Sequence, residues 1–414
     1  MAHAACTRRG FLKRAALATG ALAWPGALNA AAQTMPDVRL GFIGLGARGM
    51  ELLRSSPALV AGLCDVDASR LADAVKIAGQ HVPHTGDYRE LLLRADIDAV
   101  VIATPDHGHA MQAVHACEAG KYVFLETPLC RTLDESRRIA EAARLYDRRV
   151  TPSGAGAGGA AHALAEKLRD WRAEGDPAAV LKVTLTGPES PQGGDPAAMG
   201  PAPESFDWDA WLGPASYRPY NPGYSHLNWR WMLDLGGGQM RQQGAWLLAA
   251  VFDALGQTTS LMVDISAEGP PPETGLWDCP PQMAARWILE EGAVEIVWQQ
   301  TSEGRVVLEA EQGERKCRAE RTIEGIEWTP DTTASAETLP INPRAELTAW
   351  LESLDVKSDD RLSAAALGCD CANLANLAWQ LGRGLRFDSR TGRFENDEAA
   401  QRMAAEYGRG RYPW

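Results

Sequence analysis

Residues 38–49 read Val38-Arg39-Leu40-Gly41-Phe42-Ile43-Gly44-Leu45-Gly46-Ala47-Arg48-Gly49. The first half is mostly apolar, as a buried strand requires, and the second half spaces its glycines as G-x-G-x-x-G. Such glycines permit a tight turn and let a phosphate group approach the backbone closely, while the N-terminus of the next helix faces the phosphate charge. We therefore predict a strand, a glycine loop and a helix that hold a phosphorylated ligand.

An acidic residue, Asp65, completes the pattern by following the apolar run Ala58–Cys64. Its distance from the glycines is close to the ~20 residues typical of a dinucleotide-binding fingerprint. A carboxylate there binds ribose hydroxyls and repels a 2′-phosphate, so we expect NAD rather than NADP, although Arg48 would weaken this preference. The alternative is a glycine-rich turn without a ligand. The predicted cofactor-binding residues of this part are Gly44, Leu45, Gly46, Ala47, Arg48, Gly49 and Asp65.

Strand and helix patterns alternate along the first 150 residues. Strands that alternate with helices pair in parallel, so a doubly wound sheet is predicted. Besides the two strands above, we expect strands at Ala99–Ala103 and Tyr122–Leu125, and helices at Gly49–Ser55, Ala68–Ala78, His109–Ala119 and Leu133–Tyr146.

The third strand leads into Thr104-Pro105-Asp106-His107-Gly108-His109. Ligands of such sheets bind outside the carboxyl ends of the strands. We therefore expect Thr104, Pro105 and His109 beside the nicotinamide half of the cofactor. The alternative is that Asp106 caps a helix and the histidines are merely exposed.

After Arg149 the pattern changes to neighbouring strands with few helices between them, which favours a mostly antiparallel sheet. Glu290-Glu291-Gly292 is a hairpin signal, and the polar tail from Phe387 is expected on the surface. The predicted strands are Val180–Leu185, Leu261–Ile265, Ala285–Leu289, Ala293–Gln299 and Arg305–Ala310, and the predicted helices are Gln242–Leu255, Pro343–Leu354 and Ser363–Leu381. The expected parts are a leader (1–32), a Rossmann domain (36–150), a C-terminal domain (151–386) and a surface tail (387–414).

Composition and charge indicate a globular, acidic protein. The chain has 414 residues, is 45% hydrophobic and carries a net charge of -13. Removing four basic residues of the leader lowers this to about -17, which argues against nucleic acid and anionic membranes as partners. The eight cysteines form no disulfide framework. Cys369 and Cys371 are too close for the usual zinc pair, so no metal site is expected.

The first 32 residues resemble a targeting segment. Thr7-Arg8-Arg9-Gly10-Phe11-Leu12-Lys13 has a twin-arginine pattern, and an apolar run, Ala15–Ala23, follows. Small residues of the kind found at a signal-peptide cleavage site lie near Ala30-Ala31-Ala32. The run is too short for a permanent membrane helix. We therefore expect a periplasmic or secreted protein, exported in the folded state, with no stable membrane insertion after processing.

The motifs resemble the Gfo/Idh/MocA oxidoreductase family, especially its secreted twin-arginine members. The resemblance covers nearly the whole mature chain. It implies an α/β protein with an N-terminal Rossmann doubly wound parallel sheet and a C-terminal α+β domain with a large, mostly antiparallel open sheet. It also implies hydride transfer on sugars or polyols and a homo-oligomer. Besides the glycine loop, the matching stretches are Cys64–Asp67, Asp87–Leu92, Ile97–His107, Ala119–Pro128, Trp208–Ala215, Arg218–Asn221, Leu385–Asp388 and Asn396–Ala399.

The chain departs from this family where the chemistry is expected. The family pattern Glu-Lys-Pro is here Glu126-Thr127-Pro128. In the second domain, the resemblance places Gln242 at the position of an aspartate and Trp246 at that of a histidine. Oxidation of an alcohol needs a base, and loss of one acid–base group typically costs ~10²–10⁴-fold in rate.

Two hypotheses follow. The first is an oxidoreductase, or a redox-assisted lyase or glycosidase, that acts on a sugar derivative with a rearranged catalytic set. The second is an inactive homologue that keeps NAD and serves as a binding or assembly subunit. An aromatic loop, Tyr224–Trp231, either stacks on a sugar with Tyr220 and Trp246 or only packs. Glu126 is expected either to position the cofactor ring or to have a structural role only. The candidate catalytic residues are Thr127, Arg241, Gln242, Trp246 and His226.

Overall fold

The computed structural model describes residues 35–156, 158–256, 262–289, 292–331, 334–354 and 361–407. These residues belong to one compact unit with two β-sheets. The predicted leader lies outside the described residues. Within the described part of the chain, no helix has the length and apolar character needed to cross a membrane.

The first sheet is parallel and has six strands in the order β3-β2-β1-β4-β5-β6. The order reverses between β1 and β4, where sheets of this type bind ligands. Apolar runs predict four of these strands, whereas β3 and β6 have only two and three residues and carry too little pattern. The strands are β1 (Met35–Ile43), β2 (Ala58–Cys64), β3 (His84–Thr85), β4 (Ala99–Ile102), β5 (Tyr122–Leu125) and β6 (Val150–Pro152).

Local capping sets the helices that flank this sheet. The Asp67 carboxylate accepts a hydrogen bond from Ser69 N, and the Thr132 hydroxyl accepts one from Glu135 N. The third long helix begins three residues before its predicted start, because Pro105 has the extended backbone of an N-cap residue. The helices are α2 (Ala47–Ser55), α3 (Ala68–Ala78), α4 (Tyr88–Leu92), α5 (Asp106–Glu118) and α6 (Leu133–Leu145).

The second sheet has ten strands in the order β14-β13-β12-β11-β7-β10-β9-β8-β15-β16. Only the pair of β7 and β10 is parallel among the described neighbours, so the predicted fold class is confirmed. The strands are β7 (Leu181–Pro188), β8 (Met262–Glu268), β9 (Ala284–Leu289), β10 (Val294–Thr301), β11 (Val307–Gln312), β12 (Arg315–Arg321), β13 (Gly325–Thr329), β14 (Glu337–Pro340), β15 (Leu385–Asp388) and β16 (Arg393–Phe394).

Five of these strands, β12 to β16, are absent from the sequence-based prediction. In β12 only Cys317 and Ala319 are buried, and charged side chains alternate with them. The tail expected from Phe387 onward begins inside the sheet, because Phe387 pairs with Val263 of β8 and is buried. The predicted hairpin at residues 290–292 lies partly outside the described residues, although β9 and β10 do pair in antiparallel fashion.

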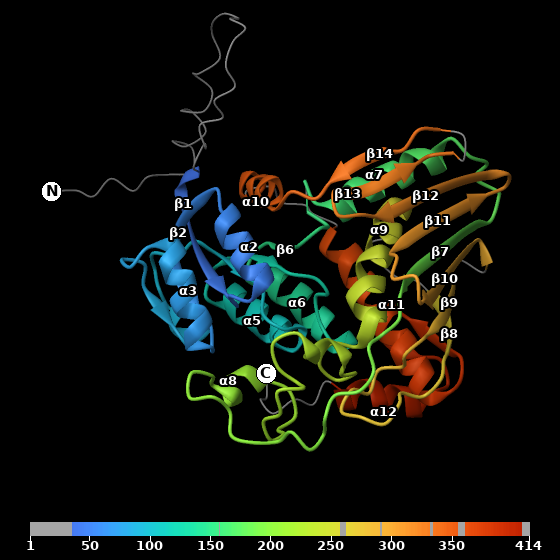
Figure 1. Cartoon of the computed structure of the whole chain (residues 1–414). Helices are drawn as coiled ribbons and strands as arrows, with labels where there is room; N and C mark the ends of the chain where they lie inside the picture. The colour runs from blue at the N-terminus through green and yellow to red at the C-terminus, as the bar shows by residue number, and fades with distance from the viewer. Residues whose placement is uncertain are drawn as a thin grey trace, which may run out of the picture. The chain divides into compact units, whose positions relative to one another are not determined.

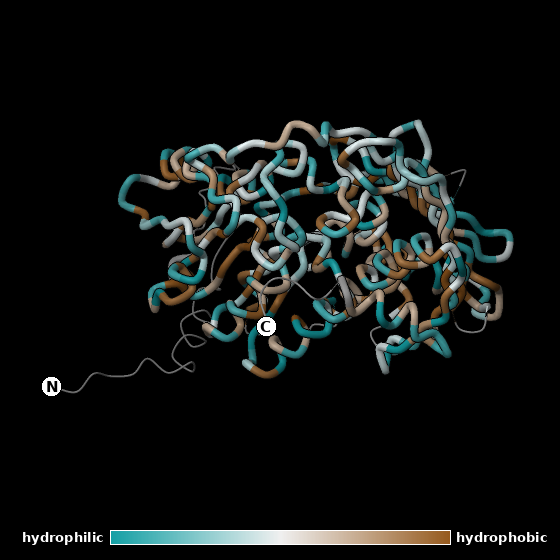
Figure 2. The backbone as a smooth tube through the Cα atoms, turned by 90° about the horizontal axis from the view of Figure 1, so that it is seen from below, coloured by the Kyte–Doolittle hydropathy of each residue, from teal (hydrophilic) through white to brown (hydrophobic). Residues whose placement is uncertain are grey.

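Three helices pack against the second sheet and form its core (Figure 1). Trp287 and Trp298 of the sheet are fully buried beneath them. Hydrophobic stretches run through the interior, and hydrophilic ones lie mainly at outer turns (Figure 2). The three helices are α7 (Ala160–Ala173), α9 (Ala245–Leu255) and α11 (Arg361–Leu381). The other helices are α8 (Trp208–Leu212), the 3₁₀ turn Asn228–Trp231, the π-helical turn Met240–Gly244, α10 (Pro343–Glu352) and α12 (Glu398–Tyr407).

Candidate functional site

A cavity of about 410 Å³ lies at the carboxyl ends of β1, β2 and β4. Its floor is the glycine loop. Gly44 has a φ of +87°, and a Cβ there would come within 2.7 Å of the backbone of Ala103. A Cβ on Gly49 would lie 1.9 Å from the Gly44 carbonyl oxygen, so both positions require glycine. A Cβ on Gly46 would meet only the Arg70 side chain, at 3.2 Å, and this part of the backbone is open to a ligand.

The Asp65 carboxylate lies beside the glycine loop and lines the cavity. Its Oδ2 accepts a hydrogen bond from Leu45 N at 2.6 Å, and its Oδ1 accepts one from Asp67 N at 2.9 Å. Burial raises the pKa of Asp65, and the two backbone hydrogen bonds oppose this rise. Because each carboxylate oxygen can accept more than one hydrogen bond, Asp65 can also bind a ribose diol.

Arg48 lines the cavity but is committed to carboxylates. Its Nε donates to Glu126 Oε1 at 2.9 Å, and another nitrogen donates to Glu51 at 2.9 Å. A guanidinium nitrogen also lies 3.7 Å from Glu346 of α10. Glu126 therefore holds Arg48 in this structure.

Sequence reasoning missed Glu346, whose Oε1 accepts a hydrogen bond from Gly154 N. Burial raises the pKa of Glu346 to about 7, and the charge of Glu126 adds to the rise. In the sequence, Asn342 and Glu346 only mark the start of a helix, since Asn342 accepts from Ala345 N as its N-cap. No local pattern brings Glu346 to the Rossmann sheet.

The segment after β4 places Thr104 and Pro105 in the cavity wall and turns the histidines inward. His109 is 1% exposed, and its two ring nitrogens lie 2.8 Å from the carbonyl oxygens of Pro128 and Thr104. Burial lowers the pKa of His109, and a neutral ring donates to only one of these oxygens. His107 is equally buried, with Nε2 2.7 Å from the Trp211 carbonyl oxygen. The alternative of exposed histidines is therefore wrong.

Gln242 reaches the Rossmann domain from the π-helical turn. Its Nε2 donates to Asp106 Oδ2 at 2.8 Å and to the Gly236 carbonyl oxygen at 3.1 Å. Asp106 is 1% exposed, and burial raises its pKa to about 7, against the opposing charges of Arg241 and Arg230. The side-chain amide of Gln242 therefore links the second domain to the Rossmann domain through the carboxyl group of Asp106. This carboxyl group has a pKa near neutral pH.

The raised pKa of Asp106 predicts a pH-dependent stability. The folded state keeps this proton up to about pH 7. The unfolded state releases it near pH 4, so the carboxyl lowers the free energy of unfolding as pH rises between these values. Relative to wild type, Asp106→Asn should gain about 2 kcal/mol between pH 5 and pH 8. Urea unfolding at both pH values measures this gain, and an equal difference at both would contradict it.

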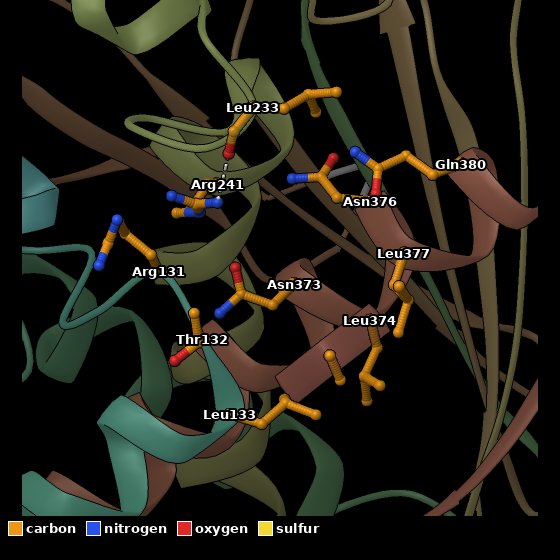
Figure 3. Close-up of a pocket in the computed structure, with 11 residues that line it drawn as sticks. Arg131, Thr132, Leu133, Leu233, Arg241, Asn373, Leu374, Asn376, Leu377 and Gln380 are labelled. Carbon is orange, nitrogen blue, oxygen red and sulfur yellow. Dashed lines mark hydrogen bonds between the residues drawn. The ribbon is translucent and has the colours of Figure 1, made fainter. Parts of the chain in front are cut away.

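Arg241 turns away from the dinucleotide cavity. It is 3% exposed and donates to the carbonyl oxygens of Leu233 at 3.0 Å and Leu235 at 3.3 Å. It lines a second cavity, of about 40 Å³, together with Arg131 and residues of α11 (Figure 3). Among the described residues, Arg241 Nε and Asn376 Oδ1 have no hydrogen-bond partner.

The remaining catalytic candidates lie in separate places. Thr127 is half-buried and precedes a cis peptide bond to Pro128. Trp246 packs against the core of the second sheet, and its Nε1 donates to Gln243 at 3.1 Å. His226 lines the dinucleotide cavity, where its Nδ1 lies 2.6 Å from an Arg70 nitrogen. No described hydrogen bond or ion pair joins these three residues.

The aromatic loop Tyr224–Trp231 packs against the segment before it, since Tyr224 stacks on Trp208 and His226 lies against Phe206. Trp208 and Trp211 stack with ring centroids 4.7 Å apart, and Tyr220 packs edge-on against Trp208. The segment before the loop also contacts the Rossmann domain, since Ala68 N donates to the Ser205 carbonyl oxygen at 2.7 Å. Trp211 and His226 therefore form one wall of the dinucleotide cavity, a placement that the sequence did not predict.

The strand order, the glycine loop and Asp65 define a two-domain protein of the Rossmann dinucleotide-binding class. Residues 38–153 match the model of the oxidoreductase family's NAD-binding Rossmann fold, and residues 191–414 match that of its C-terminal alpha/beta domain. The chain belongs to the Gfo/Idh/MocA oxidoreductase family.

Curated relatives share part of the sequence, and solved structures share the fold. A glycosyl hydrolase family 109 protein of Shewanella pealeana is 35% identical over 133 residues, which is 29% of each chain. The aligned part thus spans less than a third of that relative. KijD10, a 3-ketoreductase from Actinomadura kijaniata solved with NADP and TDP-benzene, has a TM-score of 0.56 at 17% identity, covering 80% of this chain and 95% of that one. A Synechocystis biliverdin reductase with biliverdin and NADP+ gives 0.56 at 16%, covering 83% and 99%.

Proposed function

We propose that this protein is an NAD-dependent oxidoreductase that acts on a sugar or polyol derivative. The observation that carries the proposal is the intact cradle at the carboxyl ends of β1 and β2. The open backbone at Gly46 suits a pyrophosphate, and Asp65 suits a ribose diol. A bound nicotinamide dinucleotide supplies a hydride donor or acceptor, while the protein supplies orientation and proton transfer.

Asp65 supports NAD over NADP. Its carboxylate lines the cavity and would repel a 2′-phosphate there. Arg70 also lines the cavity and could attract such a phosphate, but His226 and Asp67 already hold its guanidinium. The ketoreductase and the biliverdin reductase structures contain NADP. The identity of the dinucleotide released from this protein therefore tests the preference for NAD over NADP directly.

The catalytic set of this proposal is non-standard. Thr127, Gln242 and Trp246 stand where the family pattern has groups that exchange protons at neutral pH. Arg48 lies between Glu346 and Glu126 and contacts both carboxylates. Glu126 directly follows β5, so Glu346 lies near the carboxyl end of that strand. Because its pKa is raised to about 7, Glu346 can take or give a proton at physiological pH. Glu346 is buried and does not line the cavity, so in this proposal it is a positioning residue that acts through Arg48 and Glu126.

A specific observation favours the second candidate function, an inactive NAD-binding homologue. The Gln242 side chain is occupied by Asp106 and Gly236, so it acts as a link between domains. Such a protein would keep its cofactor as a structural ligand and serve as a binding or assembly subunit.

The substrate class, the oligomer and the location are further parts of the proposal. The similar proteins include a glycosyl hydrolase family 109 protein and a ketoreductase solved with a TDP ligand, which supports a sugar-like substrate. The twin-arginine pattern at Arg8-Arg9 supports export to the periplasm. We also propose a homo-oligomer, which size-exclusion chromatography with light scattering would test.

The first test is the content and reactivity of the cofactor. Heat treatment of the purified protein should release about one dinucleotide per chain, which is identified by its mass. A panel of sugars and polyols should then reduce the bound NAD, as followed at the nicotinamide absorbance. Glu346→Gln should keep the dinucleotide but change the pH dependence of the reduction rate near pH 7, which a purely structural residue would leave unchanged. Protein without any dinucleotide would contradict both candidate functions.

The second test restores the family's groups. If the protein is an inactive homologue, only the double variant Thr127→Lys with Trp246→His should gain reduction of bound NAD. If the protein is an active enzyme, the wild type should react, and the double variant should lose rate because the rearranged set is disturbed. Each single variant serves as the control for its partner.

A further inference from the structure

We propose that Cys130 and Cys369 form a site of disulfide formation that cross-links the Rossmann domain to α11. Their sulfur atoms lie 3.5 Å apart, although the residues are separated by 239 positions in the sequence. Both side chains are buried, at 0% and 1% exposure. The Cys369 thiol also lies 3.1 Å from the Cys130 carbonyl oxygen.

The two thiols are already close to bonding distance. A disulfide has a sulfur–sulfur length of about 2.05 Å, so the sulfur atoms must approach by about 1.5 Å. Among the described cysteines, no other pair has its sulfur atoms in contact. Cys371 is equally buried on the same helix, yet no described sulfur atom lies within hydrogen-bonding distance of its own.

The reaction balances with a small peroxide as the oxidant. Two sulfur–hydrogen bonds break and one sulfur–sulfur bond forms, while hydrogen peroxide takes the two electrons and two protons and becomes two molecules of water. The contact with Cys369 and burial raise the pKa of the Cys130 thiol. Because the thiolate is the reactive form, we expect a slow reaction that a small neutral oxidant can complete within the folded protein.

The disulfide between Cys130 and Cys369 would connect two parts of the fold that are far apart in the sequence. Cys130 lies two residues after Pro128, in the segment that leads from β5 into α6. Helix α11 packs on the second sheet, so the disulfide would tie the segment that follows Thr127 to the other domain. Closing so long a loop restricts the unfolded chain, and we expect the melting temperature to rise by about 5 °C.

The test counts free thiols in the full chain. Protein treated with hydrogen peroxide is denatured and labelled with N-ethylmaleimide, and the label is counted by intact mass. The eight cysteines should take eight labels before oxidation and six after it. Peptide mapping without reductant should recover one cross-linked peptide that contains Cys130 and Cys369, and reduction should restore all eight labels.

Two matched variants test whether Cys130 forms the disulfide. Cys130→Ala should keep all seven remaining thiols under the same oxidation and should show no rise in melting temperature. Cys371→Ala, a buried cysteine of the same helix, should still lose two thiols and gain thermal stability. Loss of two thiols in Cys130→Ala, or oxidised wild type in which Cys130 and Cys369 stay reduced, would overturn the proposal.

Discussion

Gly46→Val is expected to lower dinucleotide affinity by about 100-fold or more, which corresponds to about 2.7 kcal/mol. Gly46 has φ -68° and ψ -169°, a conformation that any residue adopts, so the substitution introduces no backbone strain. Its Cβ would meet only the flexible Arg70 side chain within the protein. The added methyl groups would instead occupy the space where a pyrophosphate must approach the loop.

The measurement is dinucleotide content after purification, followed by calorimetric titration with NAD. Circular dichroism should show an unchanged fold. Gly200→Val is the control, because a Cβ there meets no atom within 4 Å and lies outside the cradle. Full dinucleotide content in Gly46→Val would refute the proposed cradle, whereas unfolding of this variant would refute the assignment of Gly46 as an open position.

The N-terminal sheet could be predicted because its central strands are buried on both faces. Val100, Val101 and Ile102 of β4 are at most 1% exposed, and such strands are near-continuous apolar runs in the sequence. Strand β12 differs, because its outward side chains are arginine, lysine and glutamate that pair across the sheet. Arg318, for example, forms an ion pair with Glu309 of β11. Its strand character depends on neighbours that the local sequence does not reveal.

The candidate site was predictable only where its groups are close in sequence. The glycine loop and Asp65 belong to one strand–helix–strand unit, so their relation could be deduced from spacing. Glu346 reaches Arg48 from a helix about 300 residues further along the chain, and no local pattern reports that approach. His109 has the expected place in sequence, yet the fold turns its ring between two carbonyl oxygens and away from the cavity.

The second large effect concerns the buried ion pair of Arg131 and Glu135. Their side chains are 6% and 2% exposed, and the guanidinium lies 2.7 Å from the carboxylate. Glu135 also accepts a hydrogen bond from Arg131 N at 2.7 Å. Glu135→Leu would leave Arg131 as a buried cation without its partner, so we expect a loss of about 3–5 kcal/mol in the free energy of unfolding. Urea unfolding followed by tryptophan fluorescence measures this loss.

A double variant separates the cost of an unpaired charge from the value of the pair. Glu135→Leu combined with Arg131→Met removes both charges, and it should recover most of the lost stability, because a buried pair roughly balances its own desolvation. Asp73→Asn is the control, since its pair with Lys76 is exposed and should be worth only about 0.2–0.5 kcal/mol. If the double variant were as unstable as Glu135→Leu alone, the carboxylate itself would be essential, through its bond to Arg131 N at the start of α6. Arg131 and Arg241 line the same small cavity between the two domains. That result would therefore mean that Glu135 stabilises the contact between the domains at this cavity.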